Sequence, residues 1–129
     1  MPVDTQMNVL IIDDYQTMRG VIRNLFKQLG FDNIHEASTT DEALEILKSG
    51  EPFGLVVFDW QTGPARGEDF MQSVRAEEKL KGVPFIFVSA ESGEEQLAAM
   101  KKADVSDFMA KPFTKATLRR KMIGLFGEF

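Results

Sequence analysis

Two adjacent aspartates, Asp13 and Asp14, come directly after the apolar run of residues 9–12. Two carboxylates about 4 Å apart repel by about 4 kcal/mol at an effective dielectric constant near 20, so the pair needs a compensating positive charge. A third carboxylate, Asp59, ends the apolar run of residues 55–58. Magnesium prefers oxygen ligands and binds proteins through one or two carboxylates together with phosphate and water. The three acids therefore predict a site for Mg²⁺, in which Mn²⁺ is a plausible substitute.

Two further polar residues make this set suitable for phosphoryl transfer. Ser89 follows the apolar run 85–88, and Lys111 follows the run 107–110. A carboxylate can attack phosphorus to form an aspartyl phosphate, and a hydroxyl and an ammonium group can stabilise charge on the phosphoryl oxygens. We expect Asp59 to make the attack, because the third strand of a flavodoxin-like sheet lies beside the first. The paired acids are then left as metal ligands.

The elements that must position these residues alternate regularly along the chain. Continuous apolar runs of four or five residues are typical of strands that are covered on both faces. Four such strands are predicted, at residues 9–12, 55–58, 85–88 and 107–110, and a weaker run at residues 33–37 predicts a fifth. Segments between them have helical periodicity, as in the apolar stripe from Met18 to Leu29 that ends at Gly30. The alternation predicts one α/β domain with a parallel sheet, helices on both faces and reactive residues at the carboxyl ends of the strands.

The later helices are marked by residues at their starts. Thr39 with Glu42 has the spacing of a capping box, and so does Ser92 with Glu95. The last helix is expected to follow Thr114. Its predicted apolar face consists of Leu118, Met122, Leu125 and Phe126.

Composition limits the classes of function. The absence of cysteine excludes disulfides, thiol chemistry and Cys-ligated zinc. A formal charge of −5 argues against general binding to nucleic acid or to an anionic membrane. The chain has neither a signal peptide nor an apolar run of about 20 residues, so we expect a cytoplasmic protein with protein or small-ion partners.

Segments along nearly the whole chain resemble one known family. The segments "LIIDDYQTMRGVIRNLFKQLGF", "FDW", "VSAES" and "AKPFTKATL" are similar in order and separation to those of receiver domains of bacterial two-component response regulators, especially the CheY-like chemotaxis type. The resemblance implies a flavodoxin-like (βα)5 fold, doubly wound, with strand order 2-1-3-4-5. It also implies that a histidine kinase supplies the phosphoryl group.

The resemblance assigns a role to each motif residue. Asp59 is the phosphoacceptor, Lys111 the phosphate-pairing cation and Ser89 the switch hydroxyl. Asp13, Asp14 and Asp59 hold magnesium together with the backbone carbonyl of Gln61. Phe108 stands where CheY has the switch tyrosine. Gln61 and Glu91 are the residues that tune the phosphoryl lifetime. Pro112 follows a cis peptide bond.

The expected activity is that of a stand-alone receiver domain spanning residues 1–129, a monomer without an output domain. It is a phosphoacceptor switch rather than an enzyme, with at most self-phosphorylation and autodephosphorylation. The resemblance implies that output leaves through the face formed by the fourth helix, the fifth strand and the fifth helix, toward the flagellar motor switch protein or another phosphorylation-dependent target. Basic residues on the last helix, Lys115, Arg119, Arg120 and Lys121, form either this docking face or a solvated face favoured by the helix dipole.

Three alternatives stay open. The first is a phosphate sink or phosphorelay receiver that does not act on the motor. The second is an aspartyl-phosphate phosphatase, although such enzymes usually carry an acid where Gln61 stands. The third is flavin binding, which the acid-rich crevice disfavours. His35, the only histidine, is expected at a surface or edge rather than as a phosphodonor, and Trp60 either packs at the rim of the site or reports binding by its fluorescence.

Overall fold

The fold is a five-stranded parallel sheet in the order β2-β1-β3-β4-β5. The computed structural model describes residues 6–13, 15–50, 52–59, 70, 72–77, 80, 82–89, 107–110 and 114–126, of which 59, 89 and 107–110 are described by their backbone only. The elements are β1 (Asn8–Ile12), α1 (Gln16–Gln28), β2 (Ile34–Ala37), α2 (Thr40–Lys48), β3 (Phe53–Asp59), β4 (Phe85–Ser89), β5 (Asp107–Ala110) and α5 (Lys115–Phe126). The predicted flavodoxin-like strand order is confirmed.

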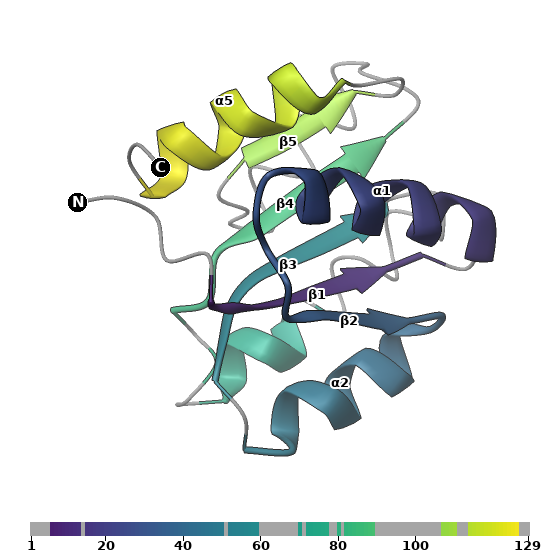
Figure 1. Ribbon diagram of the computed structural model, residues 1–129. Helices are drawn as coiled ribbons and strands as arrows, with labels where there is room; N and C mark the ends of the chain where they lie inside the picture. The colour runs from purple at the N-terminus through teal and green to yellow at the C-terminus, as the bar shows by residue number, and fades with distance from the viewer. Residues whose placement is uncertain are drawn as a thin grey trace.

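Helices cover both faces of the sheet (Figure 1). One face carries α1 and α5, and its apolar cluster joins Val9 and Ile11 of β1 to Phe26 of α1 and Met122 of α5. The other face carries α2 and a helical stretch over residues 70 and 72–76. Successive residues of a strand point to opposite faces, so an uninterrupted apolar run supplies both clusters. This confirms the interpretation of the runs in β1, β3 and β4 as strands buried on both sides.

The end of α1 follows the glycine signal in the sequence. Gly30 has a φ of 102°, a conformation that favours glycine, and its amide donates to the carbonyl of Lys27 at 3.0 Å. The amide of Phe31 donates to the carbonyl of Phe26 at 3.0 Å, and these two rings meet edge to face at 5.6 Å. This pair of backbone bonds with an apolar contact is the Schellman motif. It turns the chain from α1 into β2.

Side-chain caps start α2 and α5. The Thr39 hydroxyl accepts from the amide of Glu42 at 3.1 Å, and the Thr114 hydroxyl accepts from the amide of Thr117 at 3.2 Å. The predicted capping box at α2 is only half formed, because the Glu42 carboxylate accepts from the Ser38 hydroxyl at 3.2 Å instead of returning to the cap. The second predicted box, at residues 92 and 95, lies outside the described residues.

Two strands begin before their apolar runs. β1 begins at Asn8 and β3 begins at Phe53, and these two residues pair across a register shift next to Val9. A Cβ on Gly54 would come within 2.9 Å of the Met7 Cβ, so glycine here lets the N-terminal segment cross close to β3. None of the helices in the described part of the chain is long and apolar enough to cross a membrane.

Candidate functional site

The strand register brings the carboxyl ends of β1, β3 and β4 to one edge of the sheet. Ile12 is level with Phe58, so Asp13 and Asp59 are the next residues along two neighbouring strands. β4 ends at Ser89, one residue beyond the position paired with Asp59. Neighbouring strands lie about 4.8 Å apart, so this edge is a place where residues distant in the sequence can meet.

Several predicted site residues lie outside the described part of the chain. These are Asp14, Trp60, Gln61, Glu91, Lys111 and Pro112, together with the side chains of Asp59, Ser89 and Phe108. Their convergence therefore stays a prediction. Among the side chains that the structure describes, no three acidic or histidine groups come together as a metal site.

Asp13 is the one predicted acid whose side chain the structure describes, and it is fully buried. Its Oδ1 accepts from the backbone amide of Tyr15 at 2.9 Å, and its own amide donates to the carbonyl of Ala37 at 3.1 Å. Burying a carboxylate is costly unless hydrogen bonds or a cation compensate for it. A buried oxygen donor at the carboxyl edge fits the chemistry of a magnesium ligand.

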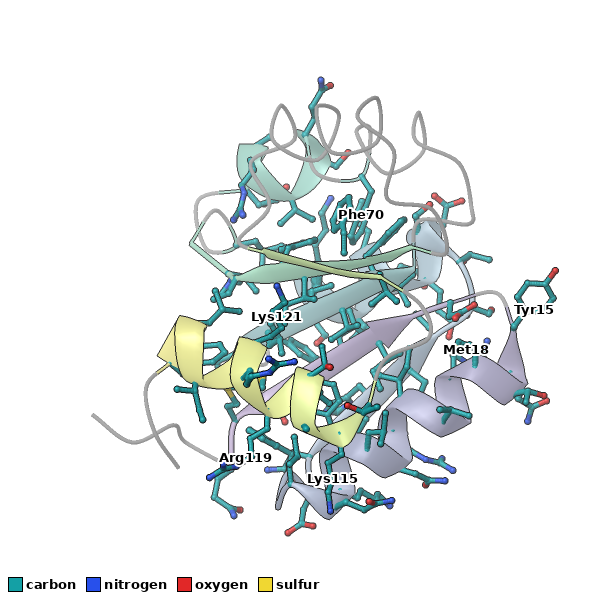
Figure 2. The ribbon with its side chains drawn as sticks, turned by 90° about the horizontal axis from the view of Figure 1, so that it is seen from above. Tyr15, Met18, Phe70, Lys115, Arg119 and Lys121 are labelled. Carbon is teal, nitrogen blue, oxygen red and sulfur yellow. The ribbon has the colours of Figure 1, made fainter. Side chains whose placement is uncertain are left out.

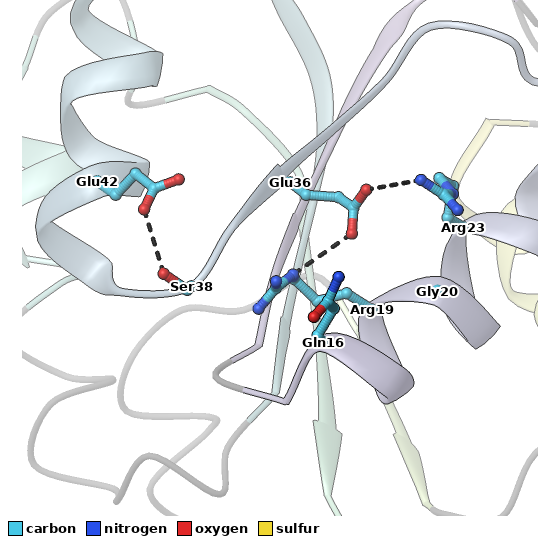
Figure 3. Close-up of a pocket in the computed structure, with 7 residues that line it drawn as sticks. All are labelled: Gln16, Arg19, Gly20, Arg23, Glu36, Ser38 and Glu42. Carbon is cyan, nitrogen blue, oxygen red and sulfur yellow. Dashed lines mark hydrogen bonds and ion pairs between the residues drawn. The ribbon is translucent and has the colours of Figure 1, made fainter.

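An arginine connects this acid to the neighbouring strand β2. Arg19 donates from Nη1 to the backbone carbonyl of Asp13 at 2.6 Å and from Nε to Oε1 of Glu36 at 3.3 Å. A second arginine, Arg23, pairs through Nη1 with Oε2 of the same carboxylate at 3.0 Å. Figure 3 shows Glu36 between the two arginines of α1. Each oxygen of Glu36 thus binds one guanidinium.

These groups line a cavity of about 300 Å³ between α1 and the start of α2 (Figure 3). Its lining residues are Gln16, Arg19, Gly20, Arg23, Glu36, Ser38 and Glu42. This cluster was not predicted from the sequence. One signal was available, because Arg19 and Arg23 are four residues apart and therefore share a face of the first helix.

His35 has the edge position that was expected. It lies on β2 at the edge of the sheet, and its Nε2 is 3.2 Å from Oδ1 of Asn8. Its ring meets Phe53 edge to face at 5.1 Å. His35 pairs with Leu10 and lies two residues before the carboxyl end of β2.

Similarity to known proteins identifies the family to which this chain belongs. A model of the response regulator receiver domain matches residues 9–123. The chain belongs to the response regulator receiver family. Two curated relatives of this receiver are chemotaxis proteins. It is 40% identical to CheY-3 of Vibrio cholerae serotype O1 over 124 residues, which cover 96% of this chain and 95% of CheY-3. It is also 40% identical to CheY of Pseudomonas aeruginosa over 120 residues, which cover 93% of this chain and 96% of that protein.

Solved structures share the fold. The crystal structure of Vibrio cholerae CheY4 has a TM-score of 0.84 at 21% identity and covers 94% of this chain and 99% of CheY4. The receiver domain of the sensor histidine kinase PA1611 from Pseudomonas aeruginosa has a TM-score of 0.81 at 21% identity, covering 92% of this chain and 96% of that domain. The PA1611 domain has a magnesium ion coordinated in its active site cleft.

The basic residues on α5 of this receiver divide into two groups. Lys115, Arg119 and Arg120 are exposed, whereas Lys121 is half-buried. Figure 2 shows Lys115 and Arg119 on one side of α5 and Lys121 on the other, as expected for residues four and six positions apart on a helix. Lys115, Arg119 and Arg120 are thus the exposed basic residues of α5, and their role as a docking face stays a prediction.

Proposed function

We propose that this receiver is a phosphorylation-dependent signalling switch that accepts a phosphoryl group on Asp59 from a histidine kinase. The observation that carries the proposal is the shared carboxyl edge. Asp13 is buried at the end of β1, and Asp59 ends the adjacent strand β3 in matching register. The family and the CheY relatives support a role in two-component signalling and chemotaxis.

The proposed reaction transfers a phosphoryl group from a histidine side chain of the kinase to the side chain of Asp59. A carboxylate oxygen of Asp59 attacks the phosphorus of a phosphohistidine, a P–O bond forms, and the P–N bond breaks. The bonding electron pair leaves with the imidazole, which then takes a proton from solvent. In this scheme the Lys111 ammonium and the Ser89 hydroxyl stabilise the charge on the phosphoryl oxygens.

The proposed metal ligands are Asp13, Asp14, Asp59 and the backbone carbonyl of Gln61. A bound Mg²⁺ supplies positive charge that offsets repulsion between the carboxylates and the incoming phosphoryl group. The buried carboxylate of Asp13 supports this assignment, and the PA1611 receiver domain gives a precedent for magnesium in the fold. We expect Mn²⁺ to substitute.

The proposed output is binding of a partner protein in the cytoplasm. A new charge at Asp59 biases a two-state element that includes Ser89 and Phe108, and this changes the face that contains α5. The exposed Lys115 and Arg119 suit an acidic partner surface. Beyond self-phosphorylation and autodephosphorylation, no enzymatic activity is proposed.

Intact mass spectrometry after incubation with acetyl phosphate and magnesium tests the acceptor. We expect the unaltered protein to gain one phosphoryl group and Asp59→Asn to gain none. Asp32→Asn is the matched control, because Asp32 is an exposed acid preceding β2, at the opposite edge of the sheet. Absence of any gain in the unaltered protein would overturn the proposal.

Binding assays with flagellar motor switch protein, with and without beryllofluoride, test the chemotaxis role. We expect beryllofluoride to strengthen binding and charge reversal in Lys115→Glu or in Arg119→Glu to weaken it. Lys27→Glu, which reverses the charge of an exposed lysine near the end of α1, is the control for each of the two single charge reversals on α5. A protein that accepts phosphate but does not bind the motor protein would instead be a phosphate sink or relay.

A further inference from the structure

The corner between β1 and α1 is held by three hydrogen bonds that meet at Asp13. Its amide donates to Ala37 on β2, its Oδ1 accepts from the Tyr15 amide, and its carbonyl accepts from Arg19 Nη1 at 2.6 Å. This carbonyl belongs to the peptide group that joins Asp13 to Asp14 in the sequence. The Arg19 bond therefore restrains the carbonyl of the peptide group that follows Asp13.

Arg19 is itself held at two points. Its side chain is only 16% exposed, and its Nε donates to Glu36 while Nη1 donates to Asp13. A guanidinium presents these donors in a rigid planar fork, so fixing one of them orients the other. Glu36 therefore helps to orient Arg19 toward the backbone carbonyl of Asp13.

We infer that Arg19, oriented by Glu36, is a positioning residue for the metal-binding corner. This inference rests on the proposed function, because it assumes that Asp13 and Asp14 bind magnesium. Arg19 is not a ligand of the ion. Its role is to fix the backbone that carries the ligands, as the outer partners of metal ligands do in other sites.

The role is tested by whether Arg19→Gln raises or lowers the affinity for magnesium. If only its charge acted, Arg19 would repel the ion, and Arg19→Gln would tighten magnesium binding. If positioning dominates, Arg19→Gln weakens magnesium binding by about tenfold, a typical loss for outer partners of metal ligands. Isothermal titration calorimetry with magnesium chloride measures this change without requiring phosphorylation.

Arg23→Gln is the matched control. Arg23 binds the same Glu36 from the same helix, but its bond goes to Oε2 and it makes no contact with Asp13. We expect this variant to bind magnesium as the unaltered protein does. Arg19→Lys should also weaken binding despite keeping the charge, because a lysine ammonium cannot reproduce the planar fork.

Amide hydrogen exchange of Tyr15 in magnesium-free protein provides a second readout. Its amide donates to Oδ1 of Asp13, so a loosened corner exposes it. We expect faster exchange in Arg19→Gln than in Arg23→Gln. If Arg19→Gln does not fold, Glu36→Ala replaces it, since it removes the acceptor oxygens that hold Arg19 and keeps the guanidinium.

The outcomes separate the inference from the function on which it rests. Failure of the unaltered protein to bind magnesium contradicts the proposed function. Normal magnesium binding that is unchanged or tighter in Arg19→Gln, or weakened equally by Arg23→Gln, overturns the positioning role alone. Weaker binding and faster Tyr15 exchange confined to changes at Arg19 and Glu36 support it.

Discussion

Replacing glycine by alanine at three positions with open space around them tests how backbone conformation, rather than packing, affects stability. A Cβ added at Gly20, Gly124 or Gly50 would meet no atom within 4 Å. Gly20 lies within α1 and Gly124 within α5, whereas Gly50 follows the C-cap of α2 with a φ of 102°. Substitution by alanine adds the same methyl group at each position, so any difference in stability comes from the backbone.

The largest gain in stability is expected at Gly20. Alanine is favoured over glycine by about 1 kcal/mol in a helix interior, because glycine loses more backbone freedom on folding. Gly20→Ala should therefore stabilise the protein by about 1 kcal/mol, which corresponds to about 3 to 6 °C in Tm for a domain of this size. Gly124→Ala lies in the last turn of its helix and should gain about half as much.

Gly50→Ala should change stability in the opposite direction. Its positive φ places a Cβ close to the following carbonyl, and this costs about 1 to 2 kcal/mol for a residue other than glycine. Urea denaturation monitored by circular dichroism measures all three variants. A loss of stability in Gly20→Ala, or a gain in Gly50→Ala, would refute the reasoning. Unchanged magnesium affinity in Gly20→Ala would separate its effect from that of the neighbouring Arg19.

Three further substitutions test the elements around the site. Thr39→Ala removes the acceptor for the Glu42 amide and should cost about 1 kcal/mol in a urea melt, whereas an unchanged midpoint would mean that the cap is not formed. Phe58→Ala empties the centre of a ring cluster on β3 and should cost about 3 to 5 kcal/mol in denaturant titrations, and a loss below about 1 kcal/mol would contradict the packing. Gly54→Ala should lower the Tm by crowding Met7, and the loss should shrink in a Met7→Ala background. Additive losses in that pair would show that the two residues do not touch in solution.

The three inner strands β1, β3 and β4 were predictable from sequence because each is buried on both faces. A strand with one exposed face alternates apolar and polar residues, but β1, β3 and β4 lie inside the sheet, and their interiors read as unbroken apolar runs. The weak signal of the second strand has the same explanation. β2 is an edge strand, and three of its four residues are only half-buried. The predicted strand boundaries were wrong where polar or glycine residues continue the strand pairing beyond the apolar run, as at Asn8 and Gly54.

The bonds made by charged side chains were less predictable. Arg19, Arg23 and Glu36 could have been solvated independently, since nothing in their local sequence selects a partner 13 or 17 residues away. The capping box formed only in part for the same reason, because the Glu42 carboxylate binds the Ser38 hydroxyl instead. Long polar side chains choose among several partners of similar energy, and exposed ion pairs are worth only about 0 to 1 kcal/mol. Periodicity does not encode such choices.

The candidate site depends on the register of the parallel strands. Register is harder to predict from sequence than the strands themselves, but easier than the partners of charged side chains. Apolar runs predict that β1 and β3 exist, but a shift of one residue between them would reverse which face each acid joins. The observed pairing of Ile12 with Phe58 makes Asp13 and Asp59 the next residues on adjacent strands. Buried apolar residues on both faces oppose any slippage, because a shift would carry large side chains from one packed cluster into the other. The core that makes the strands recognisable in the sequence thus also aligns the backbone positions of the two acids, and this explains how residues 46 positions apart come to lie on adjacent strands at one edge of the sheet.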